Sequence, residues 1–383
     1  MKIDLTNSVM IDNHAHSLIK RHLEIDVIEF RRAFTESNSL SMIQNHVPNS
    51  LHYMNMLNQL REIFKFDSEE ELIERRQNSR PAVHINELWD DASIGGLLVD
   101  DGYLQTSMLS ISELSNLCER PVYRILRVET LLEKLFNEAD SLSALEEALE
   151  SQIRSQRETG AKVVGLKTVV AYRGGLPFDP HEKSDSAESD FDKIKQNLSV
   201  SKKSLRLTRS PLYHQLLLRS FEIAGQLNLP IQVHTGIGDT DLILHESNPT
   251  LMTPILKDKR FAACKFVFLH CYPYHREAAY LCSVFPNCYM DLSLSSVLVS
   301  AVFRNILLEC MAAAPTTKIL AGTDGHSVPE MHWYGALTLK DALGSVLNQL
   351  VSDNYLRGAE AHRVAENILF ANCRELYELE GLL

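Results

Sequence analysis

Two histidines stand two residues apart near the start of the chain, in the run Asp12-Asn13-His14-Ala15-His16. Alternate side chains of a β-strand project from the same face, so both imidazole rings would point the same way at a strand end. Two adjacent imidazoles can chelate Zn²⁺ or a similar ion. Two solvated histidines would have the same spacing, so the pair alone does not decide the matter.

Three further polar side chains end apolar runs later in the chain. His234 ends LPIQVH, His270 ends KFVFLH, and Asp324 follows KILAGT. Each of them alone is typical of a satisfied structural residue. Together with His14 and His16 they supply four imidazoles and one carboxylate, the ligand types of a catalytic metal site that keeps positions open. We therefore predict one or two divalent ions, Zn²⁺ first, since the N/O ligand set also accepts Mn²⁺ or Fe²⁺.

The elements that must position these residues are short apolar runs that alternate with helical stretches. Continuous apolarity is expected of parallel strands that are covered by helices on both faces. Alternation of eight such strands with helices predicts one TIM-like (β/α)₈ barrel over residues 1–383, whose active site lies at the carboxyl ends of the strands. The eight expected strands are Ser8–His14, Ile94–Asp100, Pro121–Val128, Lys162–Ala171, Leu229–His234, Lys265–His270, Cys288–Leu292 and Lys318–Gly322.

The segment Ser17–Asp90 exceeds what a barrel needs between its first two strands. It is rich in charge, Leu and Met, as in HYMNMLNQLREIFKF, and is expected to be helical. A connection of this length is an insertion with structure of its own. Because βα loops emerge at the carboxyl-end mouth of a barrel, the insertion is expected to cover that mouth, to form a subunit interface, or both.

Composition excludes several classes of protein. The 38 Lys+Arg against 50 Asp+Glu give a net charge of −12, which argues against unspecific nucleic-acid binding. No run reaches the length of a membrane helix, and the N-terminus lacks the apolar core of a signal peptide. Seven cysteines at irregular spacings fit free thiols in a reducing compartment. We expect a cytoplasmic protein with a small-molecule substrate, and the sequence is compatible with a homo-oligomer.

The ordered set of His-x-His, two single histidines and an aspartate resembles the amidohydrolase superfamily. A closer resemblance is to its amidohydrolase-2 branch, in particular the domain found fused to glutamine synthetase-like proteins. The similar phrases are GLKTVVAYRGGL (165–176), QVHTGIGD (232–239), FLHCYPYHREAAYL (268–281), YMDLSL (289–294) and GTDGHSVPE (322–330).

The resemblance implies roles for the residues of this set. His14, His16, His234 and Asp324 would surround one ion, and Asp324 would also take the proton of the attacking water. His270 would either bind a second ion or donate to the substrate carbonyl oxygen as charge develops there.

Lys167 is the ambiguous residue. In binuclear relatives a Lys at the end of the fourth strand reacts with CO₂ to form a carbamate that bridges two metals. Such a reaction needs a neutral amine, and burial beside cations lowers the pKa of a Lys. The alternatives are a cation that binds a substrate carboxylate or pairs with Asp324, and a Lys without a role.

Substrate-binding candidates follow the fourth and fifth strands. Arg173 could grip a carboxylate bidentately, and Gly174 and Gly175 would let its loop approach a ligand closely. Tyr172 and Asp239 lie near the same mouth in sequence.

Three functions are compatible with this sequence. The first is hydrolysis of an amide or related C–N bond of a small carboxylate-bearing substrate, and resemblance to domains fused to glutamine synthetase suggests a γ-glutamyl-type amide. The second is non-oxidative decarboxylation with one zinc ion, as in other members of the same branch. The third is a metal-binding barrel that serves as an interaction surface, which a site with open positions disfavours.

Overall fold

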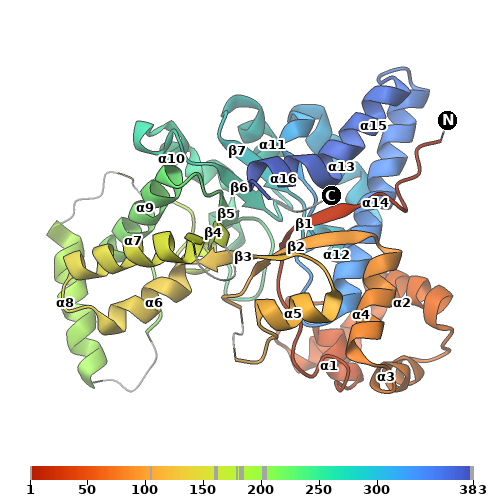
Figure 1. The fold of residues 1–383 in the computed structure, drawn as a ribbon, viewed down its shortest axis with the longest axis horizontal. Coiled ribbons are helices and arrows are strands. Elements are labelled where there is room, and N and C mark those ends of the chain that lie inside the picture. The colour runs from red at the N-terminus through yellow and green to blue at the C-terminus, as the bar shows by residue number, and fades with distance from the viewer. Residues whose placement is uncertain are drawn as a thin grey trace.

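Eight parallel strands follow one another in chain order around a barrel (Figure 1). A computed structural model describes residues 2–103, 106–158, 163–177, 180, 185–200 and 205–379. The strands are β1 (Met10–Ala15), β2 (Ile94–Asp100), β3 (Val122–Arg127), β4 (Val163–Thr168), β5 (Ile231–His234), β6 (Phe266–Leu269), β7 (Cys288–Asp291) and β8 (Ile319–Leu320). The predicted (β/α)₈ fold is therefore confirmed, with strand ends displaced by a few residues.

The ladder runs without interruption from β1 to β8, and each neighbouring pair is parallel. Where the first and last strands meet, the backbone amide of Asn13 donates to the Ala321 carbonyl at 2.8 Å. The backbone amide of Asp324 donates to the His14 carbonyl, also at 2.8 Å. These bonds bring the two ends of the strand order together. Every residue of β4, β5 and β6 is buried, as expected for strands enclosed by helices.

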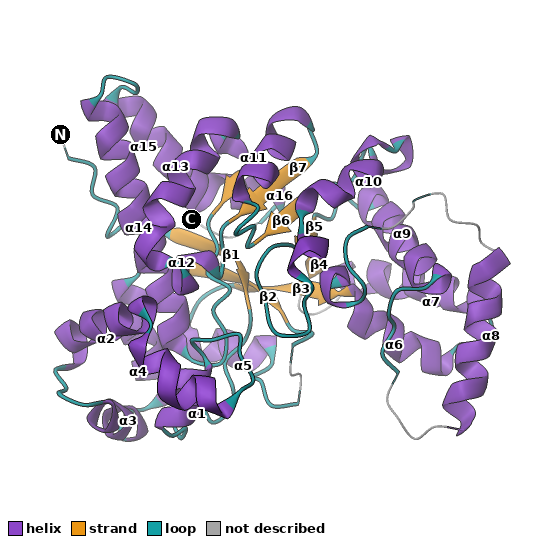
Figure 2. Cartoon of the chain, turned by 180° about the vertical axis from the view of Figure 1, so that it is seen from behind, coloured by secondary structure: helices purple, strands orange, loops and turns teal. Residues whose placement is uncertain are grey.

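Helices surround the barrel, and α6–α9 extend from the side opposite α1–α4 (Figures 1 and 2). Some of them begin at a side-chain cap, such as Ser210, which accepts from the Tyr213 backbone amide and precedes Pro211 at the start of α9. The helices are α1 (Val27–Arg32), α2 (Leu51–Phe64), α3 (Glu69–Gln77), α4 (Pro81–Asp91), α5 (Ile111–Cys118), α6 (Val128–Glu138), α7 (Leu142–Glu158), α8 (Asp185–Val200), α9 (Pro211–Gln226), α10 (Thr253–Lys257), α11 (His275–Val284), α12 (Ser295–Leu298), α13 (Phe303–Ala313), α14 (Pro329–Ser352), α15 (Gly358–Glu366) and α16 (Asn372–Leu376).

The helices α1–α4 belong to the segment between β1 and β2, and a buried ionic group ties them to α14. The Arg76 guanidinium on α3 donates to Glu330 of α14, with Nε 2.6 Å from Oε1. His84 on α4 lies 2.7 Å from the same carboxylate oxygen, and all three side chains are buried. Trp89 adds a hydrogen bond from its ring nitrogen to the Pro329 carbonyl. The inserted helices are thus anchored to the barrel through buried polar contacts.

Within the described part of the chain, none of the helices combines the length and the apolar character that crossing a bilayer requires. The seven cysteines are all free, as the sequence predicted, and all are buried.

Candidate metal centre

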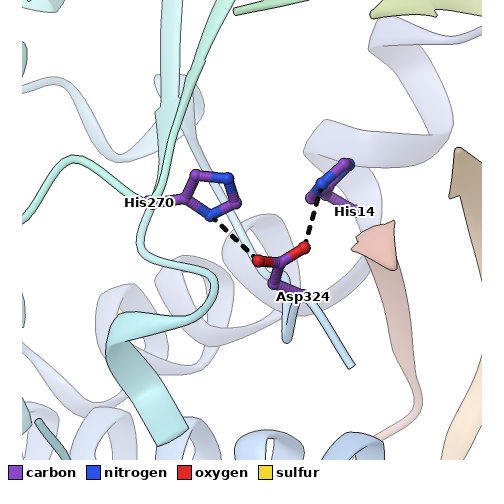
Figure 3. A group of neighbouring side chains, drawn as sticks. All are labelled: His14, His270 and Asp324. Carbon is purple, nitrogen blue, oxygen red and sulfur yellow. Dashed lines mark ion pairs between the residues drawn. The ribbon is translucent and has the colours of Figure 1, made fainter. Parts of the chain in front are cut away.

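The carboxyl ends of β1, β6 and β8 bring a histidine–carboxylate cluster together. The ligand atoms of His14, His270 and Asp324 all lie within 4.8 Å of one another (Figure 3). Nε2 of His14 is 3.1 Å from Asp324 Oδ1, and Nε2 of His16 is 3.3 Å from the same oxygen. On the other side of the carboxylate, His270 Nδ1 is 3.6 Å from Oδ2. Residues more than 300 positions apart in sequence therefore meet at one mouth of the barrel.

The tautomer of His14 follows from its neighbour Gln232. The Gln232 amide nitrogen donates to the Asn13 carbonyl at 2.8 Å and to the Tyr377 hydroxyl at 3.0 Å, so its oxygen is the atom that faces His14. That oxygen lies 2.8 Å from His14 Nδ1. Because an amide oxygen only accepts, Nδ1 carries the hydrogen, and the lone pair of Nε2 points at Asp324.

His16 is oriented in the same way by backbone. Its Nδ1 lies 2.9 Å from the Asp100 carbonyl, which also only accepts a hydrogen bond, so its Nε2 lone pair faces Asp324. Among the described residues nothing donates a hydrogen bond to Asp324 Oδ1, although this atom is buried. Two nitrogen lone pairs and a carboxylate oxygen thus converge without a proton between them. A divalent cation satisfies such an arrangement, so the residues fit the predicted metal.

The charge states agree with metal binding. Burial, with Lys167 nearby, lowers the pKa of His14 to about 4. Burial also lowers the pKa of His270 and of His234 well below the usual histidine value. Burial works to raise the pKa of Asp324, but the surrounding imidazoles, His270 foremost, outweigh it and hold that pKa well below its ordinary value. The histidines are thus readily deprotonated and the aspartate is readily ionised, and these are the forms that bind metals.

His270 is held by a chain of hydrogen bonds. The Ser293 hydroxyl donates to Asp291 Oδ1 at 2.7 Å and lies 2.9 Å from His270 Nδ1, so it accepts the hydrogen of that nitrogen. The Nε2 lone pair of His270 is therefore available. The backbone is left-handed at His270 (φ 64°) and at Asp324 (φ 55°), a conformation that is costly outside glycine and that clusters at functional sites. The structure places His270, predicted as a catalytic residue, inside the cluster itself.

His234 lies beside the cluster. Its ring centroid is 4.4 Å from that of His270 and 4.5 Å from that of Tyr172, and 5% of the residue is exposed. However, its Nε2 is 3.1 Å from the Ile237 carbonyl, to which it donates. Nδ1 is consequently the nitrogen that His234 could offer to an ion, and its predicted role as a ligand stays a prediction.

Lys167 is buried next to the cluster, with Nζ 3.3 Å from His14 Nε2. Burial lowers its pKa to about 8, although the carboxylates of Asp100 and Asp324 work in the opposite direction. With this pKa a larger fraction of the amine is uncharged near neutral pH than in an exposed Lys, which makes it more reactive. Both of its predicted functions, carbamate formation and pairing with a carboxylate, are compatible with this position.

A cavity of about 520 Å³ opens above the cluster. The three predicted substrate-binding residues line it, and the inserted segment forms part of its wall through residues such as Arg32 and Glu36. Arg173 also pairs with Glu133 of α6, with Nη1 2.8 Å from Oε1, and Tyr172 accepts a hydrogen bond from the Asp239 amide at 3.3 Å.

Sequence reasoning missed several residues that shape this site. Gln232 precedes His234 by two positions, so a shared strand face could have indicated it. Arg127 and Asp100 end β3 and β2, and their bidentate pair fixes the carbonyl that orients His16, with Nη2 2.6 Å from Oδ2. Their positions at strand ends were a usable signal. Glu36 lies in the inserted segment, where no pattern relates it to the barrel.

The fold and this cluster define the class of protein. Residues 142–358, more than half of the chain, match the sequence model of the Amidohydrolase family, and the chain belongs to this family. Members of the amidohydrolase superfamily are metal-dependent enzymes. The chain is 28% identical over 400 residues to protein fluG of Emericella nidulans, an alignment that covers 97% of this chain and 46% of fluG. The chain therefore spans about half the length of this relative.

Solved structures show the same architecture. A putative metal-dependent hydrolase from Lactobacillus casei superposes with a TM-score of 0.87 at 29% identity, covering 100% of both chains. A uronate isomerase from Bacillus halodurans superposes with a TM-score of 0.67 at 12% identity, covering 98% of this chain and 94% of the isomerase. At that low identity the second likeness concerns the fold alone.

Proposed function

We propose that this protein is a metal-dependent hydrolase that cleaves an amide or related C–N bond of a small carboxylate-bearing substrate, with a γ-glutamyl-type amide as the first candidate. The observation that carries the proposal is the convergence of the His14 and His16 lone pairs on Asp324 Oδ1. Membership of the amidohydrolase family and the likeness to the Lactobacillus casei protein support hydrolysis. The γ-glutamyl assignment rests on the resemblance to domains fused to glutamine synthetase-like proteins.

The residues that would hold the ion are His14, His16 and Asp324, with His270 or His234 completing the set. When bound, a divalent cation, of which Zn²⁺ is our first choice, lowers the pKa of a water ligand and polarises a substrate carbonyl. Gln232 and the Asp100 carbonyl fix the two imidazoles in the tautomer that leaves Nε2 free, and such neighbours tune the strength of the ligands.

Proton transfer is assigned to Asp324. Its two oxygens differ, because Oδ1 faces His14 and His16 whereas Oδ2 faces His270. We assign to the carboxylate the acceptance of the proton of the attacking water and its return to the leaving nitrogen, as general base and then general acid. His270 donates its Nδ1 hydrogen to Ser293, so its Nε2 lone pair suits a second ion, whereas donation from Nε2 to the carbonyl oxygen would require the protonated ring.

The test is a comparison of products with metal-reconstituted protein. Release of an amine from amide substrates, without release of CO₂ from aryl carboxylates, is the expected result. Release of CO₂ alone would replace hydrolysis with decarboxylation. Metal content per chain is measured in parallel, and ¹³C NMR after incubation with labelled bicarbonate reports carbamate at Lys167, with Lys167→Ala as the control.

A further inference from the structure

The arginines on the barrel side of the cavity already have carboxylate partners within the protein. Arg127 pairs with Asp100, with Nη2 2.6 Å from Oδ2. Arg173 pairs with Glu133 at 2.8 Å. Arg206 pairs with Asp241 at 3.2 Å, and Arg32 lies at the exposed rim. The positive charge of these three paired arginines is therefore largely balanced before a substrate binds.

Glu36 differs from these groups. It follows α1 in the inserted segment and lines the same cavity, half-buried. Among the residues that the structure describes, no hydrogen bond or ion pair reaches its carboxylate. Asp239 lines the cavity too, and among the described residues its carboxylate accepts a hydrogen bond from the backbone amide of Asp241, 2.8 Å from Oδ1, and meets no cation. Two carboxylates thus face the cavity without a cation.

A carboxylate in such surroundings is costly unless a donor or a cation approaches it. Burial, together with the negative charges of Asp324 and Asp239, raises the pKa of Glu36 to about 8. An ammonium group offers three donors and a positive charge, which would satisfy carboxylates of this kind. Asp324 lines the same cavity, is 7% exposed and has an unpartnered oxygen, so this cavity is built for charged ligands.

We propose that Glu36, with Asp239, binds a positively charged amino group of the substrate, so that the amide cleaved here carries an ammonium on its acyl part. This inference rests on the proposed hydrolysis and narrows its substrate class. It makes Glu36 a specificity-determining residue that is contributed by the insertion, whereas the candidate metal ligands come from the barrel.

Three p-nitroanilides that differ in one group each test the inference. L-γ-Glutamyl p-nitroanilide carries an ammonium and a carboxylate, glutaryl p-nitroanilide lacks only the ammonium, and 4-aminobutanoyl p-nitroanilide lacks only the carboxylate. Wild-type protein should prefer the two compounds with an ammonium. Glu36→Gln should lower kcat/KM for these two by about 10–100-fold, mainly through KM, and should leave the glutaryl compound nearly unaffected.

Glu24→Gln is the matched control, because Glu24 is exposed in the same inserted segment and does not line the cavity. Metal content and the unfolding midpoint, measured for each variant, report whether the fold is intact. A wild type that does not distinguish the glutaryl from the γ-glutamyl compound overturns the inference. An equal loss for all three compounds in Glu36→Gln also overturns it, because it indicates a structural role.

Equilibrium binding of the same three compounds keeps this test separate from the test of hydrolysis. If none of them releases nitroaniline, the proposed hydrolysis of such amides fails. Calorimetric titration of wild type and Glu36→Gln then still decides the inference. Tighter binding of the ammonium compounds, lost in the variant, supports it, and binding that is absent or independent of the ammonium refutes it.

Discussion

Replacing Gln232 by Leu should weaken metal binding although Gln232 would touch no ion. The substitution keeps a side chain of similar size but removes the oxygen that accepts the Nδ1 hydrogen of His14, at a distance of 2.8 Å. His14 is then free to place its hydrogen on Nε2, the atom that faces Asp324. Metal binding would then require the hydrogen to move from Nε2 to Nδ1 of His14. The imidazole ring would also have to be held in place without the hydrogen bond to Gln232.

The expected magnitude follows from the groups that lose their partners. Loss of a hydrogen-bond partner behind a metal-binding histidine typically costs about 10–100-fold in metal affinity. The metal-free protein should also be destabilised, since the Asn13 carbonyl loses the Gln232 amide and His14 Nδ1 loses its acceptor. Each buried polar group left unsatisfied costs about 1–3 kcal/mol.

Competition with a chromophoric chelator at fixed pH measures the affinity, and urea unfolding of the metal-free protein measures stability. Tyr377→Phe is the control, because it removes a hydrogen bond to Gln232 but leaves the oxygen that faces His14 in place. We expect the control to bind metal as wild type does. A Gln232→Leu protein that folds and binds Zn²⁺ with wild-type affinity would refute the assignment of the tautomer.

Three further predictions concern activity, the insertion and pH. Asp324→Asn should reduce turnover by at least about 10²–10⁴-fold even where metal stays bound, because an amide cannot accept the proton of water; near wild-type turnover would contradict the mechanism. Arg76→Met should lower the free energy of unfolding by about 3–5 kcal/mol by leaving the buried Glu330 charge without its guanidinium, and Arg76→Met/Glu330→Met should cost less in the same urea titration. The pKa of Glu36 is raised to about 8 in the folded state, so above the ordinary carboxyl pKa the folded protein binds more protons than the unfolded chain. The free energy of unfolding therefore falls as the pH rises towards about 8. Metal-free wild type should therefore lose unfolding free energy relative to Glu36→Gln between about pH 5 and pH 8, and parallel pH curves would exclude this.

The barrel could be predicted because its strands are enclosed. Runs such as LPIQVH and KFVFLH are mainly apolar and end in a histidine, so both the strand and its functional end are visible in one pattern. The carboxyl ends of parallel strands meet at one mouth, which is why His14, His16 and Asp324 could be expected to meet.

The details of the site depend on contacts between segments that are distant in sequence. Nothing in the order of residues indicates that His234 donates to the Ile237 carbonyl while His270 points at Asp324. Likewise, Arg173 meets Glu133 because α6 packs beside the loop after β4. The position of Glu36 follows from the packing of the inserted helices against α14, which helical periodicity alone does not predict.

The hydrogen bonds between the first and last strands also set the order in which this site can be completed during synthesis. The Asn13 amide needs the Ala321 carbonyl, and the Asp324 amide needs the His14 carbonyl. A growing chain presents His14 and His16 first, and the carboxylate that they face is translated more than 300 residues later. An ion bound at this site would meet its full set of ligands only after β8 has docked, so metal loading would follow translation of nearly the entire barrel. The free energy of metal binding would then be added when β8 closes the barrel against β1, and it would oppose separation of these two strands.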